Sequence, residues 1–463
     1  MLFNSAEFIF CFLPIVLFGY FVLNHYDQPK QAKIWLFLAS LFFYGWWNPW
    51  YLPIILGSML VNFQIGKLVS NLILTKWKRI FVTIGIIANV LLLVFFKYTD
   101  FLIENTNGLL STDFNLLHIA LPLAISFFTF QQIAYLCDSY KGLTGSYTFF
   151  NYGLFVSFFP QLIAGPIVHH TEMMPQFFNK KSNYFNHENA SKGIYMFFMG
   201  FGKKVIIADT FAAIANAGYA NTGELSLIDG WVTSLAYAIQ LYFDFSGYTD
   251  MAIGAALMFN INLPLNFNSP YKALSIQDFW RRWHMTLSRF LRDYIYIPLG
   301  GNRNGELKTL TNLMITFIIG GIWHGAGWTF VFWGFMHGAG LIIHRLWQKS
   351  GVKMPSILAL FITFNFVNVA WVFFRATSWQ DAINVLHAMI GMNAASGLTV
   401  ISDFYSLPIL ILGVILLFGK NTNERLAEFK PDMRHAVAAT AMIVLGVIYI
   451  NSITASEFLY FDF

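Results

Sequence analysis

Charged residues are scarce in this chain of 463 residues. They make up 11% of it, against roughly 25% in soluble globular domains. Polar stretches long enough to form a soluble domain are also missing, and the longest lie near 169–192 and 260–308. Hydrophobic residues instead make up 57% of the chain, in recurrent apolar windows that match the roughly 20 residues needed to cross a bilayer. The composition therefore predicts a polytopic membrane protein.

The alternating apolar and polar pattern of a membrane β-barrel is missing as well, because the apolar runs are continuous. Every backbone polar group in lipid needs an internal partner, so we expect an all-α helix bundle that forms one domain over residues 1–463. Prolines within the runs predict breaks or re-entrant segments. The expected membrane helices lie near 8–24, 33–47, 51–66, 80–97, 119–137, 149–164, 193–215, 230–258, 309–322, 327–347, 356–374, 403–419 and 434–452.

Several function classes lose support from further absences. Cys11 and Cys137 are the two cysteines, too few for a disulfide framework or a metal set, so we expect no metal site and no bound cofactor. The net charge of +5 is small for this length and does not indicate nucleic-acid binding. The P-loop, GxSxG and HExxH motifs are missing, which argues against ATP-driven transport, hydrolase-type acyl transfer and zinc proteolysis.

One segment, residues 277–299, combines arginines with aromatic residues and reads QDFWRRWHMTLSRFLRDYIYIPL. Four arginines make a fully spanning helix improbable, so we expect it at the cytoplasmic interface, partly buried among the other helices. Within it, Arg281, Arg282, Trp283 and His284 have two interpretations. They form either an interfacial belt or a site for an anionic, phosphate-bearing donor, because the guanidinium fork of arginine binds oxyanions in pairs.

Two histidines lie in an apolar stretch without charged side chains, residues 320–340, which reads GGIWHGAGWTFVFWGFMHGAG. On one continuous helix, His324 and His337 would be turned roughly 140° apart, which argues against a shared metal site unless the glycines break the helix. An intramembrane histidine is a functional candidate, although a buried histidine bonded to a carbonyl is the alternative. With no serine or cysteine nucleophile evident, such a histidine suits general-base work on a bound hydroxyl.

A second polar group lies in the predicted helix 230–258. Gln240 and Asp244 are four residues apart and therefore share one helical face. They either line a tunnel or form interhelical hydrogen bonds, and the second interpretation is slightly favoured.

Taken together, the motifs are similar to those of a known family. The stretch DFWRRWHMTLSRFLRDYIYIPLGGNR, followed some forty residues later by GIWHGAGWTFVFWGFMHG, resembles the membrane-bound O-acyltransferase superfamily. The resemblance is closer to its bacterial branch that serves O-acetylation of alginate and peptidoglycan. Supporting stretches run from end to end, and they are MLFNSAEFIFCFLPIV, FFYGWWNPWYL, LPLAISFFTFQQIAYLCDSY, FFPQLIAGPI and YFDFSGYTDMAIG.

The resemblance implies a bundle with a central tunnel and transfer of an acyl group, usually acetyl, from a cytoplasmic thioester, here acetyl-CoA, toward an extracytoplasmic polysaccharide. The superfamily histidine falls on His324 and the second family position on His284, with Arg281 and Arg282 toward the donor phosphates. His337 matches no catalytic position and is interpreted as structural or secondary. The implied location is the bacterial inner membrane, in contact with lipid, and the implied partner is an extracytoplasmic hydrolase-fold protein.

The C-terminal sequence EFLYFDF contains an F-x-Y-x-x-F pattern made by Phe458, Tyr460 and Phe463. It resembles the motif of a small membrane protein that works beside the D-alanyl transferase of teichoic acids, which implies that Tyr460 is an acyl relay. The alternative is an aromatic anchor at the membrane interface. Two rival functions stay open at this point, D-alanyl transfer and membrane transport without chemistry, and the sequence does not identify the polysaccharide.

Overall fold

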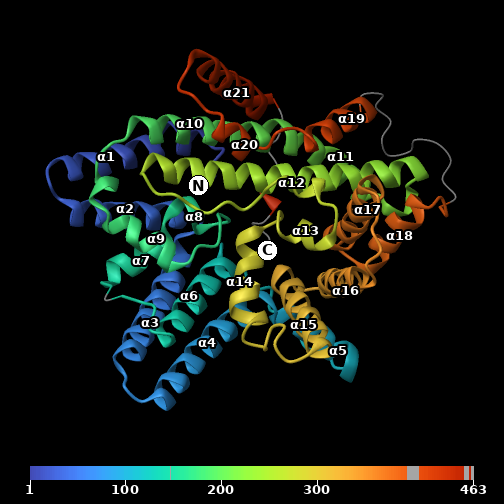
Figure 1. Cartoon of the computed structure of the whole chain (residues 1–463), viewed down its shortest axis with the longest axis horizontal. Coiled ribbons are helices and arrows are strands. Elements are labelled where there is room, and N and C mark those ends of the chain that lie inside the picture. Colours follow the sequence, from blue (N-terminus) through green and yellow to red (C-terminus); the bar gives the residue numbers. More distant parts are fainter. Residues whose placement is uncertain (146, 394–405, 453–457, 460–463) are drawn as a thin grey trace.

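The computed structural model describes residues 1–145, 147–393, 406–452 and 458–459, and its regular elements are all helical (Figure 1). Short π-helical segments interrupt the α-helices at Glu7–Phe12, Lys203–Ala208 and Arg292–Tyr296. The α-helices are α1 (Leu13–His25), α2 (Pro29–Gly45), α3 (Leu52–Asn71), α4 (Thr75–Lys97), α5 (Thr99–Leu110), α6 (Ile125–Tyr140), α7 (Phe149–Ser157), α8 (Phe159–Leu162), α9 (His170–Phe178), α10 (His187–Gly202), α11 (Asp209–Ala220), α12 (Leu227–Met258), α13 (Ile276–Trp280), α14 (Met285–Leu291), α15 (Glu306–His324), α16 (Trp328–Ser350), α17 (Ser356–Arg375), α18 (Trp379–Met389), α19 (Ser406–Leu417), α20 (Thr422–Ala427) and α21 (Met433–Ser452).

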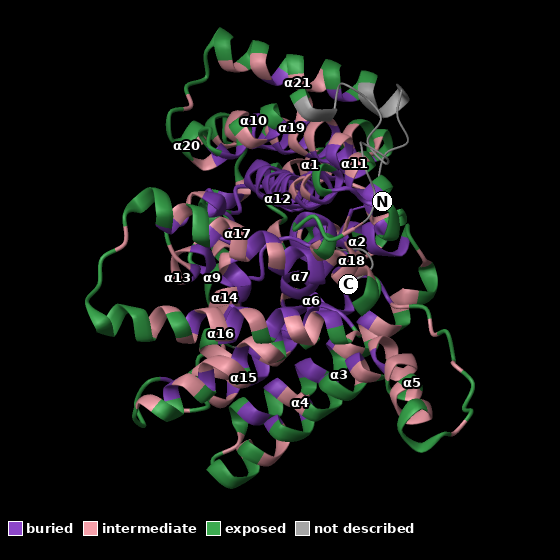
Figure 2. Ribbon diagram, turned by 90° about the vertical axis from the view of Figure 1, so that its right-hand side faces the viewer, coloured by how far each residue is buried: buried purple, intermediate pink, exposed green. Residues whose placement is uncertain are grey.

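The axis of the molecule is α12, which runs through the middle of the bundle (Figures 1 and 2). It has 32 residues, and every residue from 236 to 258 is buried. A helix that is buried around its whole circumference belongs to the core, and its polar residues need partners inside the protein. Helices α8, α10, α11, α17, α18 and α19 pack against it, with α10 and α11 along its length.

Glycine lets α10 and α12 approach closely. A Cβ atom on Gly193 would lie 2.6 Å from the carbonyl oxygen of Gly254, and one on Gly200 would lie 2.5 Å from that of Gly247. The two pairs are seven residues apart on each helix, as antiparallel packing requires. Small residues at such crossings bring helix backbones together, which is a common way of associating helices in membranes.

Among the residues that the structure describes, four helices are long and apolar enough to cross a membrane. They span Glu7–His25, Pro49–Asn71, Thr75–Lys97 and Ser356–Arg375. Large apolar side chains on them, such as Phe18, Leu91 and Phe361, are more than half exposed, as expected for helices that face lipid. These findings confirm a helical membrane protein.

The segment 277–299 does not form one spanning helix, in agreement with the prediction. It consists of α13, a connection that contains His284, α14 and a π-helical segment. Other boundaries were wrong. The helix predicted from 119 begins at Ile125, because Pro122 precedes it and the Asp100 carboxylate accepts hydrogen bonds from the backbone N–H groups of Leu117 and His118, which holds that segment as a loop.

The helix expected at 193–215 is confirmed, within a helical stretch from His187 to Ala220 that includes the π-helical segment Lys203–Ala208. The continuous helix expected at 149–164 is wrong, because it breaks between α7 and α8, next to Pro160. Proline cannot donate the backbone hydrogen bond that a helix interior needs. Helices α5 and α18 were missed because both are too short to cross a bilayer, with 12 and 11 residues.

The antiparallel pair α15 and α16 yields a stability prediction. A Cβ atom on Gly334 would lie 2.4 Å from the carbonyl oxygen of Phe317 and 3.2 Å from the Cα atom of Gly321, and backbone cannot move aside cheaply. Gly334→Ala should therefore lower the melting temperature of the purified protein, with an overpacking cost of about 1–3 kcal/mol. The control is Gly57→Ala in α3, where nothing lies within 4 Å of the new methyl group. A melting temperature equal to that of wild type would contradict the close packing.

Candidate active site

His324 is the last residue of α15, and its side chain is buried among aromatic rings. Its ring centroid lies 4.9 Å from that of Trp323, 5.0 Å from Trp333 and 5.1 Å from Phe374. Directly after it, Gly325 leaves the helix in an extended conformation, and a Cβ atom there would collide with the ring of Phe330 at 2.1 Å. The aromatic rings and the glycine together fix where the imidazole can lie.

The break at Gly325 separates His324 from His337, which lies in α16. The helices expected at 309–322 and 327–347 are thus confirmed as separate, and the glycine-rich connection between them is the reason that helical spacing does not relate the two histidines. The indole N–H of Trp280 donates a hydrogen bond of 3.2 Å to Nδ1 of His337. The ring of Trp333 lies between the two histidines, 5.0 Å from His324 and 4.6 Å from His337. His337 thus has a packing partner outside the surroundings of His324.

His284 lies in the connection between α13 and α14, fully buried, with a left-handed backbone conformation at φ 43° and ψ 52°. This conformation is uncommon for a residue with a side chain and persists where its surroundings hold it. The backbone N–H of Met285 donates to the carbonyl oxygen of Asn266, and the N–H of Asn268 donates to that of Arg282. These two bonds tie the connection to the loop that follows α12.

The side chain of Asn266 determines the tautomer of His284. Its Oδ1 lies 3.1 Å from Nδ1 of His284, 2.9 Å from Oγ1 of Thr286 and 3.3 Å from the backbone nitrogen of Thr286. A backbone N–H can only donate, so the shared atom must be the amide oxygen, which can only accept. Nδ1 of His284 therefore carries a proton, and in the neutral ring Nε2 holds the lone pair.

Trp323 lies between the two candidate histidines. Its ring centroid is 6.4 Å from that of His284 and 4.9 Å from that of His324. The ring of Phe130, in α6, stacks on the indole ring of Trp323 at 4.9 Å, with an interplanar angle of 17°. The fold therefore brings together two histidines that are forty positions apart in the sequence, as the motif comparison predicted.

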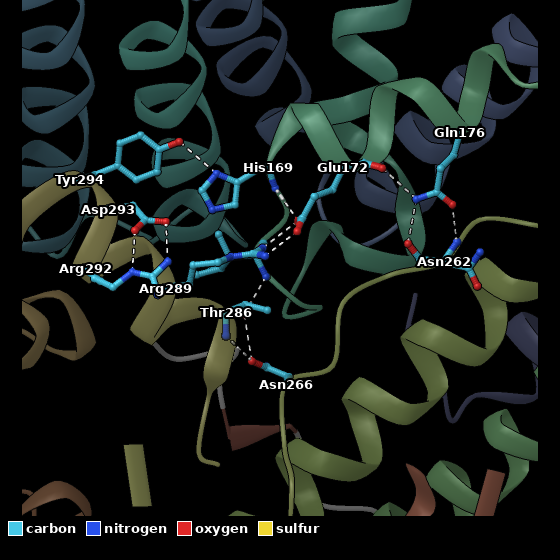
Figure 3. A network of polar contacts seen from close by, with 11 residues as sticks. His169, Glu172, Gln176, Asn262, Asn266, Thr286, Arg289, Arg292, Asp293 and Tyr294 are labelled. Atoms are coloured by element: carbon cyan, nitrogen blue, oxygen red, sulfur yellow. Dashed lines mark hydrogen bonds and ion pairs between the residues drawn. The ribbon is translucent and has the colours of Figure 1, made fainter. Parts of the chain in front are cut away.

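A polar network connects α14 to α9, and Figure 3 shows its members. The backbone N–H of Ile167 donates to Oγ1 of Thr286 at 3.0 Å. Three residues further along α14, Arg289 donates two hydrogen bonds to the carboxylate of Glu172, one of them at 2.7 Å. The helix that begins at His284 is thus fastened to a separate part of the chain.

The same network extends to a second pair of histidines. The hydroxyl of Tyr294 donates toward the carboxylate of Asp138 at 3.0 Å and lies 3.0 Å from Nδ1 of His169 (Figure 3 shows the contact with His169). Asp138 also pairs with His170 at 3.2 Å. Burial lowers the pKa of the His169 imidazole, and Arg289 adds to this effect, whereas burial and the Asp138 carboxylate raise the pKa of the Tyr294 hydroxyl.

Sequence reasoning did not single out Asn266, Thr286 or the network around Tyr294. Each of these residues acts through partners more than a hundred positions away or across a loop, and a single polar residue in a loop gives no periodic signal.

The predicted donor residues lie in different surroundings. Arg281 is exposed, whereas the guanidinium of Arg282 is held at 2.8 Å by Asp278, one helical turn before it. Trp283 is buried, stacked on Phe279 at 5.7 Å and close to Trp371 at 5.0 Å. Of the three, Arg281 is therefore the side chain that faces outward.

Gln240 and Asp244 are both buried in α12. A carboxylate oxygen of Asp244 lies 2.8 Å from Nζ of Lys204, whose ammonium also pairs with Asp209 at 2.8 Å. The ion pair connects α12 to the π-helical segment Lys203–Ala208, which corresponds to the interhelical interpretation.

Asp244 also accepts a hydrogen bond from the C-terminal segment, of which residues 458–459 are described. The backbone N–H of Leu459 donates to its Oδ2 at 3.0 Å, and the ring of Phe458 stacks on Tyr248 at 4.3 Å. Phe458 lies 6.0 Å from Phe245, whose ring contacts that of His284 edge-on at 4.8 Å. The C-terminal segment therefore enters the core near His284, whereas Tyr460 lies outside the described residues.

A cavity of about 360 Å³ borders the segment that follows His324. Gly325 and Ala326 line one side of it, and Lys97, Thr99 and Asp100 line another. At this cavity, polar side chains from the junction of α4 and α5 therefore lie near the end of α15.

The hydrogen bonds at Asn266 yield a second stability prediction. Asn266→Ala removes one acceptor from three donors, and buried donors without partners cost about 1–3 kcal/mol. The variant should melt at a lower temperature than wild type. Asn365→Ala is the control, because that partly buried side chain donates to the Phe361 carbonyl oxygen of its own helix and, among the described residues, makes no hydrogen bond to another segment. Equal melting temperatures for the Asn266 and Asn365 variants would contradict the conclusion that Asn266 holds His284 in place.

The chain is similar to known proteins over most of its length. The family described as "MBOAT, membrane-bound O-acyltransferase family" matches residues 138–379, which include both candidate histidines. The chain is 48% identical to a peptidoglycan O-acetyltransferase of Helicobacter pylori, over 100% of this chain and 98% of that protein.

Other relatives are more distant. The chain is 39% identical to a probable alginate O-acetylase AlgI of Pseudomonas aeruginosa, over 84% of this chain and 75% of that protein. It is 27% identical to a teichoic acid D-alanyltransferase of Bacillus subtilis, over 53% of this chain and 66% of that protein. The extent and identity of the first two matches confirm the resemblance seen in the motifs: this chain belongs to the membrane-bound O-acyltransferase family.

Proposed function

We propose that this protein transfers an acetyl group from acetyl-CoA, on the cytoplasmic side of the bacterial inner membrane, toward a hydroxyl group of an extracytoplasmic polysaccharide. The observation that carries the proposal is the pair of buried histidines on either side of Trp323, in a chain 48% identical along its whole length to a peptidoglycan O-acetyltransferase. That relative makes peptidoglycan the first acceptor to test, and alginate the second.

His324 acts as the general base in this proposal. The lone pair of its imidazole takes the proton of the acceptor hydroxyl, and the oxygen attacks the carbonyl carbon of the thioester. The C–O bond forms as the C–S bond breaks, and the thiolate leaves and is protonated. A positioned base contributes about 10²–10⁴-fold to the rate of such a step. The aromatic rings around His324 exclude water, which would otherwise compete as the nucleophile.

His284 has a role that its tautomer restricts. With Nδ1–H held by the Asn266 oxygen, the neutral ring presents a lone pair at Nε2 and accepts a hydrogen bond there. A developing negative charge needs a donor instead. For His284, positioning of a reactant is therefore favoured over stabilisation of a negative charge.

The donor phosphates are assigned to Arg281, because its side chain is exposed and its guanidinium suits oxyanions. Arg282 is held by Asp278 and serves more naturally to fix the connection that leads to His284. Trp283, buried between aromatic rings, supports that connection from the inside.

The C-terminal segment supplies an acyl relay in the proposal. Phe458 and Leu459 contact α12 near His284, and this observation supports the choice of the next residue in the sequence, Tyr460, as the relay to be tested. A phenol with a pKa of ~10 needs a base to react at neutral pH, and His324 is the base available. The acyl-phenol then passes the acetyl group to an extracytoplasmic hydrolase-fold partner, which completes the transfer to sugar.

D-alanyl transfer is the second candidate function, because the D-alanyltransferase relatives share the family. It ranks second because they match only about half of this chain. The donor distinguishes acetyl transfer from D-alanyl transfer. Either acetyl-CoA or a D-alanyl carrier protein should label the protein or release free thiol in its presence. Transport without chemistry is disfavoured by membership of an acyltransferase family.

His324→Ala should abolish the chemistry without loss of the fold. We expect thiol release from acetyl-CoA by the purified protein, and O-acetylation of peptidoglycan in cells, to fall by about 10²-fold or more. His25→Ala, an exposed histidine of α1, is the matched control. Expression and monodispersity are measured first, and acetylation at the wild-type level in a folded His324→Ala variant would refute the assignment.

Tyr460→Phe removes one hydroxyl and keeps the aromatic ring, so it separates a relay from an anchor. The relay predicts that polymer acetylation collapses while the amount of protein in the membrane is unchanged. Tyr26→Phe, which changes an exposed tyrosine, serves as the control. If Tyr460→Phe is fully active but deletion of residues 458–463 abolishes activity, the tail is an anchor and carries no acyl group.

A further inference from the structure

The helix that carries His324 ends without the usual backbone cap. The last four carbonyl groups of any α-helix lack an intrahelical partner, and many helices satisfy them with a left-handed turn. Here Gly325 is extended, at φ −160° and ψ 154°, and Gly327 is extended as well, at φ −168° and ψ 150°. The chain therefore leaves α15 directly, and the carbonyl groups of its last turn need partners from elsewhere.

Two adjacent residues at the end of α4 supply those partners. Nζ of Lys97 donates to the carbonyl oxygen of Trp323 at 2.7 Å and to that of His324 at 3.0 Å. The hydroxyl of Tyr98 donates to the carbonyl oxygen of Ile322 at 2.5 Å. Three consecutive carbonyl groups of the last turn are thus bonded by side chains more than 220 positions away in the sequence.

The charge of Lys97 adds to this arrangement. A cation at the C-terminus of a helix interacts favourably with the helix dipole. Nζ of Lys97 also lies 3.5 Å from Oγ of Ser126, which is a partner for its third N–H group. The amine is therefore directed at the protein. In the sequence, Lys97 ends an apolar run and would be interpreted as a lysine that reaches for the membrane surface.

We propose that Lys97 and Tyr98 are positioning residues for His324, which they hold in place by capping the last turn of α15. The inference rests on the proposed function in one respect, the role of His324 as the base. After His324 the chain leaves the helix at Gly325, so the backbone that follows does not cap the last turn. Without the cap, this turn frays and the imidazole loses its fixed position.

The alternative is that Lys97 contacts a ligand in the neighbouring cavity, which it lines together with Thr99 and Asp100. The bonds to Trp323 and His324 argue against this alternative, because they direct the amine at the end of α15. The two roles also differ in what they change. A positioning residue alters the turnover number kcat and the dynamics of α15, whereas a ligand contact alters KM.

The test compares Lys97→Met, Lys97→Arg and Tyr98→Phe in the full-length protein in lipid nanodiscs. Lys67→Met is the matched control, because Lys67 is an exposed lysine on the neighbouring helix α3. Hydrogen–deuterium exchange of the peptide that covers residues 319–327 reports the last turn directly. Thiol release from acetyl-CoA gives kcat and KM for the same preparations.

We expect Lys97→Met to speed exchange in this peptide and to lower kcat on the order of 10²-fold, as a displacement of about 1 Å does, with KM within twofold of wild type. Lys97→Arg should retain part of the protection from exchange and part of kcat, since it keeps a donor and the charge. Tyr98→Phe should speed exchange and lower kcat by less than Lys97→Met does. If Lys97→Met is not recovered as folded protein, the other two variants decide the question.

Unchanged exchange at 319–327 in these variants would overturn the inference, and so would a rise in KM at unchanged kcat. The proposed function fails separately, if wild-type protein releases no thiol from acetyl-CoA. In that event the exchange measurement still tests the cap, because it requires no substrate.

Discussion

Backbone carbonyl groups at a buried helix end must find hydrogen-bond donors, and around His324 this requirement organises the fold. A helix that ends inside a membrane protein has no water to satisfy its last turn. At the end of α15 the donors come from Lys97 and Tyr98 of α4, a helix near the other end of the chain. The N-terminal helices are therefore more than a lipid-facing cover, because they hold the turn from which the candidate base projects. The family match begins only at residue 138, so this support comes from outside the matched region.

The second histidine is held by the same principle with different chemistry. His284 has a left-handed backbone conformation and no regular helix around it, and the loop after α12 supplies its partners. One amide oxygen, Oδ1 of Asn266, accepts from the imidazole and from both donors of Thr286. This gives the ring a fixed tautomer as well as a fixed place. Both histidines thus depend on hydrogen bonds from distant segments, while aromatic rings provide the surrounding shape.

Packing against α12 brings other distant segments of the chain together. The helix is buried over most of its length, and glycine pairs with α10 bring the backbones close enough to exclude larger side chains. Its polar residues are used internally. Asp244 pairs with Lys204 and accepts the N–H of Leu459, so the last described residues of the chain are drawn toward His284. A buried carboxylate of this kind is stable only with such partners.

The sequence by itself determined the class of protein, the family and the two histidines, because apolar length and a dense set of short motifs are local properties that need no coordinates. It also determined that residues 277–299 do not span the membrane, since four arginines would have to enter lipid. Only the tertiary structure decided that Trp280 bonds to His337 outside the surroundings of His324, that Asn266 fixes the tautomer of His284, and that Lys97 caps α15. The physical reason is that a hydrogen-bond partner can come from anywhere in a folded chain, so polar residues reveal their need for a partner in the sequence but not its identity.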